Sequence, residues 1–278
     1  MMTESPKSPF DGFEDLFRAY RSWTEELKTA TEPALRVQKQ LHDHLERFRT
    51  GFSAWSESPA TKEMLESLRK TLISVAEFPN RFQSQLLGLA QHGWYIDPEM
   101  PLTGIRSLND AFESGAADQA SAELEEYFRQ NLDVIEERLL GLHPKRAHVL
   151  AAAFNAHRLG NYLLSIPVML TQADGIAQDM RGRQLYSARQ TKGIGGLIDG
   201  LEANDLNRHL WEVFRTQSPL LSSTDSLPAD FSGLNRHKVL HGMDYNYGSE
   251  TNALRAVSLL NFASFALADR KDSAGGDG

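Results

Sequence analysis

The chain has 278 residues, a formal net charge of −8 and no cysteine. The lack of cysteine excludes disulfides, cysteine-based zinc sites and thiol catalysis. The acidic balance argues against a protein that coats nucleic acid by bulk electrostatic attraction. No signal-peptide pattern and no apolar run long enough to span a bilayer occur in the sequence, which therefore predicts a cytoplasmic, globular protein without a membrane partner.

The N-terminal part predicts a helical module that precedes the rest of the protein. Residues 1–9 are expected to be disordered, and 10–91 to form three helical regions arranged as a hairpin or short coiled module. Pro79 should break or kink the third region. The clearest amphipathic pattern lies in the first region, where aromatic residues follow each other at helical spacing: Phe13, Phe17, Tyr20 and Trp23.

A stretch rich in proline and glycine, 92–116, predicts an ordered connector whose Trp94-Tyr95-Ile96 run inserts into a core. Beyond it, 117–268 predicts a bundle: an acidic helix that ends near Gly141, a long apolar helix kinked at Pro167, shorter helices and a final apolar helix. The tail, 269–278, is expected to be disordered. No segment alternates with the period of a strand, so the predicted fold class is all-α.

The sequence "LNRHKVLHG", 234–242, carries the strongest functional signal. Ser232 is placed to cap a helix of about ten residues, and Gly242 to end it. His237 and His241 are four residues apart and share a helix face. Arg236 and His241 are five apart and would not share a face in mid-helix, but the geometry relaxes at a helix end.

An arginine and a histidine that converge on one point suit phosphodiester chemistry. Histidine gains or loses a proton near neutral pH. Arginine presents a rigid fork of donors to phosphate oxygens and can hold developing negative charge. An RNA 2′-hydroxyl can then act as the nucleophile, and this chemistry requires no metal or other cofactor.

The run "RHKVLH", Arg236 to His241, resembles the R-x4-6-H motif of the HEPN superfamily, in which Asn, Asp or His follows the arginine and glycine often follows the histidine. The resemblance covers about 120–268. It implies an α-helical bundle, usually a homodimer with the two motifs facing each other, and in many members a metal-independent RNase of toxin or antiphage defence systems. It further implies that Arg236 and His241 are the catalytic residues.

Four further residues are candidates for supporting roles. His237 orients a phosphate or merely follows the helix face. Asn235 caps the helix, lies on its surface or bonds a neighbouring loop. Tyr245 stacks on bases or packs its own loop. The resemblance implies a polar or acidic residue on an earlier helix, and Asp174 in "TQADGI" is the best candidate.

Competing interpretations of the same residues stay open. His237 and His241 with Asp244 could bind a metal, although the glutamate of an HExxH motif is replaced by Lys238. The similar string "LNRHL", 206–210, lacks the second histidine and predicts a helix surface with a core contact through Trp211 and Phe214. The segment "KGIGGLIDG", 192–200, predicts a flexible loop rather than a phosphate loop.

The resulting hypothesis is an RNA endonuclease of HEPN type that acts in antiphage defence or as a toxin, with an antitoxin or defence protein as a further partner. The alternative is a non-catalytic HEPN-like helical module that binds RNA, nucleotide or a partner protein.

Overall fold

Helices form the whole framework of the part that the structure describes. The computed structural model describes residues 59–268, apart from 188, 190, 191, 203, 204, 217, 229, 230 and 232. Within this part the only β feature is an isolated bridge between Gln184 and Gly193, so the predicted all-α class is confirmed. The expected disordered ends, 1–9 and 269–278, and the first two helical regions of the N-terminal module lie outside the described residues.

The third region of the N-terminal module is a single helix, α3 (Pro59–Gln91). Pro79 lies inside α3, and the helix is not broken there. The chain divides into two units after Arg81. The second unit begins at Phe82 with the last turns of α3.

The predicted connector enters the core as expected. Trp94, Tyr95 and Ile96 are only 0%, 2% and 4% exposed. The Tyr95 hydroxyl lies 3.0 Å from the Ser218 hydroxyl, which ties the connector to a segment more than a hundred residues later. The connector is not irregular throughout, because it contains α4 (Leu102–Glu113), which packs against α5 (Ala117–Gln130).

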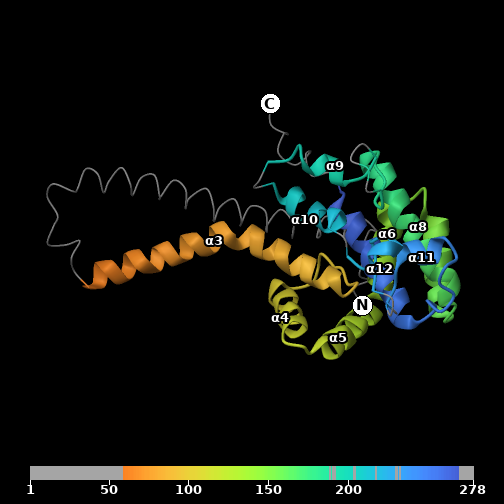
Figure 1. Cartoon of the computed structure of the whole chain (residues 1–278), viewed down its shortest axis with the longest axis horizontal. Coiled ribbons are helices and arrows are strands. Elements are labelled where there is room, and N and C mark those ends of the chain that lie inside the picture. The colour runs from red at the N-terminus through yellow and green to blue at the C-terminus, as the bar shows by residue number, and fades with distance from the viewer. Residues whose placement is uncertain are drawn as a thin grey trace, which may run out of the picture. The chain divides into compact units, whose positions relative to one another are not determined.

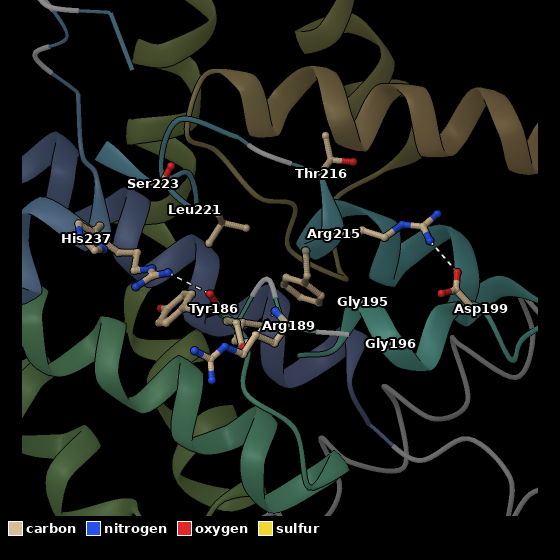
Figure 2. A pocket seen from close by; sticks show the side chains of 14 residues that line it. Tyr186, Arg189, Gly195, Gly196, Asp199, Arg215, Thr216, Leu221, Ser223 and His237 are labelled. Atoms are coloured by element: carbon tan, nitrogen blue, oxygen red, sulfur yellow. Dashed lines mark hydrogen bonds and ion pairs between the residues drawn. The ribbon is translucent and has the colours of Figure 1, made fainter. Parts of the chain in front are cut away.

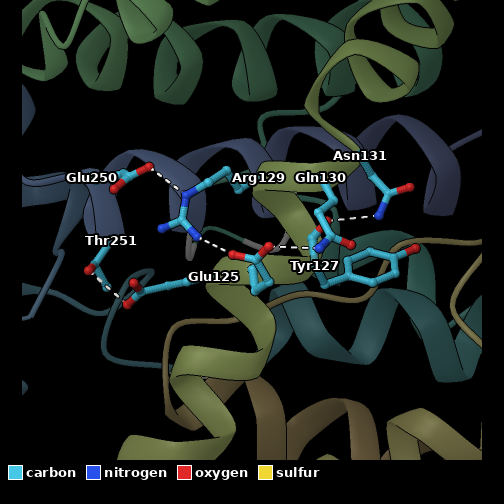
Figure 3. Close-up of polar contacts among 8 residues, drawn as sticks. Glu125, Tyr127, Arg129, Gln130, Asn131, Glu250 and Thr251 are labelled. Carbon is cyan, nitrogen blue, oxygen red and sulfur yellow. Dashed lines mark hydrogen bonds and ion pairs between the residues drawn. The ribbon is translucent and has the colours of Figure 1, made fainter.

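The acidic segment after the connector forms two helices rather than the one predicted. These are α5 (Ala117–Gln130) and α6 (Leu132–Leu142), and Asn131 separates them. The Asn131 side-chain amide donates a hydrogen bond to the Tyr127 carbonyl in the last turn of α5 at 2.8 Å (Figure 3). Asparagine competes with the backbone for such bonds and thereby favours helix ends.

The long apolar segment is also divided, into α7 (Ala147–Arg158) and α8 (Tyr162–Arg181). The division lies at Gly160, whose φ of +72° is a left-handed conformation that glycine adopts without steric cost. Pro167, the predicted kink, lies within α8, which continues through it. The two helices then pack against each other as neighbours.

The last helix, α12 (Glu250–Ala266), forms the centre of the unit (Figure 1). Thirteen of its 17 residues are buried, so α12 is surrounded by other elements rather than packed along one stripe. Helices α8, α5, α6 and α10 (Leu206–Arg215) contact it. None of the described helices combines the length and apolarity needed to cross a membrane.

Polar contacts join α5 to the start of α12 (Figure 3). Arg129 donates to Glu250 at 2.9 Å and to Glu126 at 2.5 Å, and Thr251 donates to Glu125 at 2.8 Å. The guanidinium of Arg129 lowers the pKa of Glu250. These contacts join the first turn of α12 to α5, and α12 begins directly after the loop that follows the RHKVLH segment.

The remaining elements are short and lie between α8 and α12. They are α9 (Gly195–Ile198), α10 (Leu206–Arg215), a 3₁₀ turn (Thr224–Ser226) and α11 (Arg236–Leu240). Helix α11 packs against α8.

Candidate functional site

Helix α11 is shorter than the sequence predicts and is capped by a different residue. It spans five residues, and its N-cap is Asn235, whose side-chain oxygen accepts from the Lys238 amide at 2.9 Å. The predicted helix of about ten residues with Ser232 as its cap is therefore wrong, and Ser232 itself lies outside the described residues. Gly242 follows the helix with a φ of +67°, as predicted for the residue that ends it.

Asn235 is a structural residue and is fully buried. Its amide nitrogen donates to the carbonyls of Pro219 at 2.8 Å and Ser222 at 3.0 Å. Of the predicted roles, both capping and bonding a neighbouring loop are observed, whereas a place on the surface is not. Through these bonds Asn235 attaches the start of α11 to the loop 218–222.

Arg236 is half-buried against Tyr186 (Figure 2). Its Nη2 donates to the Tyr186 carbonyl at 3.0 Å, and its Cζ lies 4.5 Å from the centre of the Tyr186 ring. Its Nε is buried and has no hydrogen-bond partner among the described residues. Burial lowers the pKa of the guanidinium, which nevertheless stays charged because arginine does not lose its proton in proteins.

Asp174 of α8 binds the backbone of the segment that contains the same tyrosine. Its carboxylate accepts from the amides of Leu185 at 2.7 Å and Tyr186 at 3.4 Å. Its negative charge raises the pKa of Arg236, although burial outweighs this effect. Asp174, the predicted supporting residue, thus lies near the motif. It binds the segment 185–186, and Tyr186 of that segment binds Arg236.

His237 and His241 lie against each other on one face of α11. Their ring centres are 4.3 Å apart, so the predicted shared face is confirmed. His241 is exposed, and His237 is partly buried. Burial, and then the charges of His241 and Arg236, lower the pKa of His237, so its imidazole is neutral at pH 7 and can accept a proton.

A pocket of about 490 Å³ opens beside Arg236 and His237 (Figure 2). Among the described residues, its wall carries three arginines, Arg189, Arg215 and Arg236, against a single carboxylate, Asp199. Hydroxyl and apolar side chains complete much of the lining: Ser187, Thr216, Ser223, Leu185, Phe214 and Leu221. The pocket is therefore locally cationic in a protein whose net charge is −8.

The three arginines differ in their partners. Arg215 donates to Asp199 at 2.8 Å and pairs with Glu212 at 2.7 Å, so its charge is compensated within the protein. Arg189 is exposed, and no described carboxylate pairs with it or with Arg236. Arg189 and Arg236 are consequently the arginines of this wall whose charge no described carboxylate compensates, and they can offer charged donors to an anionic ligand.

Two candidates from the sequence lie away from the pocket wall. Tyr245 is 81% exposed in the loop after α11, and His241 is not among the residues that line the pocket of its own chain. Asp244 accepts from the Asn246 amide at 2.8 Å, which stabilises that loop. Within one chain, therefore, the structure brings together Arg236, His237 and, through ring contact, His241.

The similar string at 206–210 has a different environment. His209 is 4% exposed, and its Nδ1 lies 2.7 Å from Gln83 Oε1, so the predicted surface position is wrong for this residue. Arg208 donates to the Leu201 carbonyl. Trp211 and Phe214 are buried, as predicted. The shared sequence LNRH thus lies in a packed helix at 206–209, whereas at 234–237 it contributes two residues to the pocket wall.

The segment 192–200 is also more structured than predicted. Gln184 exchanges backbone hydrogen bonds with Lys192 at 2.8 Å and Ile194 at 3.2 Å, and α9 follows directly. Gly195 and Gly196 line the pocket, whereas Lys192 does not. Part of the predicted loop is therefore a short helix, and backbone bonds join the start of the segment to Gln184.

Among the described residues, a metal site built on the two histidines has no third ligand. In the part of the chain that the structure describes, no three His, Asp or Glu side chains are grouped so that they could hold a metal ion. Asp244, the ligand considered from sequence, uses its carboxylate oxygen within its own loop.

Sequence reasoning missed most of the residues that line the pocket. Among them, Tyr186, Arg189 and Arg215 lie 21 to 50 positions before Arg236 and form no recognisable motif with it. Comparisons with known proteins supply no further assignment. No protein-family model, no curated protein and no solved structure matches the chain.

Proposed function

We propose that the chain is a metal-independent RNA endonuclease of HEPN type that acts as a homodimer. One observation carries the proposal: Arg236 and His237 line the same pocket, and the His237 ring contacts that of His241. A fixed cation beside two imidazoles provides both electrostatic stabilisation and proton transfer for phosphodiester cleavage.

The chemistry assigns a role to each side chain. An imidazole takes the proton of the RNA 2′-hydroxyl, and the 2′-oxygen attacks the adjacent phosphorus. Arg236 holds the negative charge on the equatorial oxygens of the five-coordinate phosphate. The bond to the 5′-oxygen breaks as an imidazolium returns a proton to that oxygen, so the products are a 2′,3′-cyclic phosphate and a 5′-hydroxyl. His241 is the proposed acid or base, and His237 positions the phosphate.

Exposed apolar side chains next to the motif support the homodimer. Leu163 and Leu164 at the start of α8 are 52% and 64% exposed, and Met243 and Tyr245 after α11 are 58% and 81% exposed. The Tyr247 hydroxyl donates to the Leu163 carbonyl, which ties the two segments together. Apolar side chains gathered on a surface favour association, and here a second copy would approach beside His241.

The acidic net charge fits a locally defined site. A chain of net charge −8 does not attract RNA over its whole surface, so binding depends on the cationic pocket. RNA selection by local shape, or by a partner such as an antitoxin or defence protein, follows from this. A role in antiphage defence or as a toxin is the physiological form of the proposal.

The test compares the purified wild type with Arg236→Ala, His237→Ala and His241→Ala on a set of labelled RNAs with EDTA present. Wild type is expected to release fragments that end in a 2′,3′-cyclic phosphate. Arg236→Ala and His241→Ala should each lose at least about 100-fold in rate. His148→Ala and Arg106→Ala are matched controls, because both side chains are exposed and distant from α11 in the sequence.

Two outcomes would redirect the assignment. If wild type leaves every RNA intact and does not slow growth when expressed, the nuclease proposal is rejected. If RNA binds to wild type without being cut, and Arg236→Ala weakens that binding, the pocket serves a non-catalytic binding module. The contact of Arg236 with Tyr186 favours this second candidate, because it gives the arginine a structural role as well.

A further inference from the structure

The pocket is larger than a single phosphate group requires. Its volume of about 490 Å³ lies in the range of roughly 300–1,000 Å³ that small-molecule sites occupy. The Arg236–His237 pair accounts for only part of the lining. The rest of the wall, contributed by 185–199 and by α10 with the residues after it, therefore has a ligand-binding capacity that the cleavage chemistry does not use.

That remaining wall carries a second, separate source of positive charge. Arg189 belongs to the segment 184–194, which backbone bonds between Gln184 and both Lys192 and Ile194 close. It pairs with no described carboxylate, whereas Arg215 is already compensated by Asp199 and Glu212. Ser187 on the same segment also lines the pocket, and its hydroxyl accepts from the Arg189 amide at 3.3 Å.

The same wall also carries apolar and mixed polar groups. Leu185, Phe214 and Leu221 are apolar, and the Arg215–Asp199 pair presents both donors and acceptors. An apolar surface with a few polar groups at its edge suits a heterocyclic base attached to a ribose. Two cationic side chains that line one pocket together with such a surface match a nucleoside that carries two phosphates.

We infer that this pocket binds one nucleotide unit with two phosphates, the first at Arg236 and His237 and the second at Arg189. That the nucleotide belongs to an RNA strand, with the first phosphate being the one cleaved, rests on the proposed function. Binding of the nucleotide itself does not depend on cleavage. Arg189 is accordingly a residue that holds the strand rather than one that touches the reacting atoms.

The experiment measures binding of adenosine 3′,5′-bisphosphate to the full chain by calorimetry, with adenosine 5′-monophosphate, adenosine and inorganic phosphate as comparison ligands. The bisphosphate should bind at least about ten-fold more tightly than the monophosphate. Arg189→Ala should remove that advantage and leave monophosphate binding almost unchanged. Arg106→Ala, which alters an exposed arginine paired with Asp110, should bind all ligands as the wild type does.

The outcomes separate this inference from the nuclease proposal. It is overturned if the bisphosphate binds no more tightly than inorganic phosphate, or if Arg189→Ala binds it as well as wild type does. Arg189→Lys should restore part of the bisphosphate affinity, because it keeps the charge but not the planar fork. A protein that cleaves RNA but does not bind the bisphosphate refutes the inference alone. A protein that binds the bisphosphate but cleaves no RNA refutes the nuclease alone.

Discussion

His143 follows α6, and its Nε2 lies 2.7 Å from the Ser264 hydroxyl in the core. Burial, followed by the charge of Arg146, lowers its pKa from 6.5 to about 4. Between pH 6.5 and about 4, His143 is therefore protonated in the unfolded chain and neutral in the folded chain. Stability contributed by neutral His143 is present above pH 6.5 and is lost as the pH falls through this window.

This shift predicts that His143 alone lowers the free energy of unfolding by about 2 kcal/mol when the pH falls from 7 to 5. Urea unfolding at the two pH values measures the change. His143→Gln should show a smaller difference, although His92, His157 and His237 keep acting in the same direction because burial lowers their pKa values too. His148→Gln should behave as the wild type, and equal pH dependence in both variants would contradict the assignment.

Asn235 gives the second prediction for a single residue. Its buried amide satisfies two carbonyls of the loop 218–222 and caps α11. Asn235→Ala leaves these groups unpaired and should lower the free energy of unfolding by about 2–4 kcal/mol. Chemical denaturation measures this loss, and Asn246→Ala, at an exposed position, is the matched control. If the two variants are equally stable, Asn235 does not anchor the loop.

At the scale of residues, the sequence predicted the members of the motif better than their environment. Arg236, His237 and His241 are found from local spacing, because a short helix brings neighbouring residues together whatever surrounds it. Tyr186 and Arg189 could not be found in this way. Their proximity to Arg236 depends on Asp174 holding the start of the 184–194 segment, a contact between distant residues.

The closed segment 184–194 supplies a prediction for an element. A Cβ at Gly193 would lie 2.0 Å from the Ser187 carbonyl oxygen, so Gly193→Ala must displace the backbone next to Arg189. Bisphosphate affinity should fall about ten-fold, the effect of one lost charge-assisted hydrogen bond. Calorimetry measures the affinity, and circular dichroism should show unchanged helix content.

The matched control is Gly104→Ala within α4, where a Cβ meets no atom within 4 Å. It should raise stability by about 0.5–1 kcal/mol, because alanine is the better helix former, and leave affinity unchanged. If Gly193→Ala binds the bisphosphate as tightly as this control does, the segment does not position the ligand.

The sequence predicted which segments are helical, but it did not predict where the helices begin and end. Apolar periodicity runs across Asn131 and across Gly160, so the sequence predicted one helix in place of α5 and α6, and one in place of α7 and α8. The breaks depend on one side-chain hydrogen bond and one left-handed glycine. The central place of α12 was visible only as a broad apolar face, since burial on all sides depends on the helices that surround it.

For the whole molecule, the main question is whether one chain completes its own site. Arg236 and His237 line the pocket of their own chain, whereas His241 does not, and exposed apolar side chains lie on the segments next to it. Within its own chain His241 reaches the pocket only through its contact with His237, so in a homodimer His241 could instead serve the Arg236 pocket of the other copy. Closed two-fold symmetry would then create two equivalent sites per dimer.

Mixing two inactive variants tests this arrangement. Arg236→Ala and His241→Ala are each expected to be inactive, yet a heterodimer of the two retains one site with an intact arginine and an intact histidine. Random re-association after mild denaturation should therefore restore about one quarter of wild-type cleavage, since half of the dimers are mixed and each has one working site of two. Cleavage of labelled RNA measures the recovery.

A mixture of Arg236→Ala with the double variant Arg236→Ala/His241→Ala is the control, because it contains no intact arginine and should stay inactive. If the first mixture also stays inactive although size-exclusion chromatography shows dimers, Arg236 and His241 act within one chain.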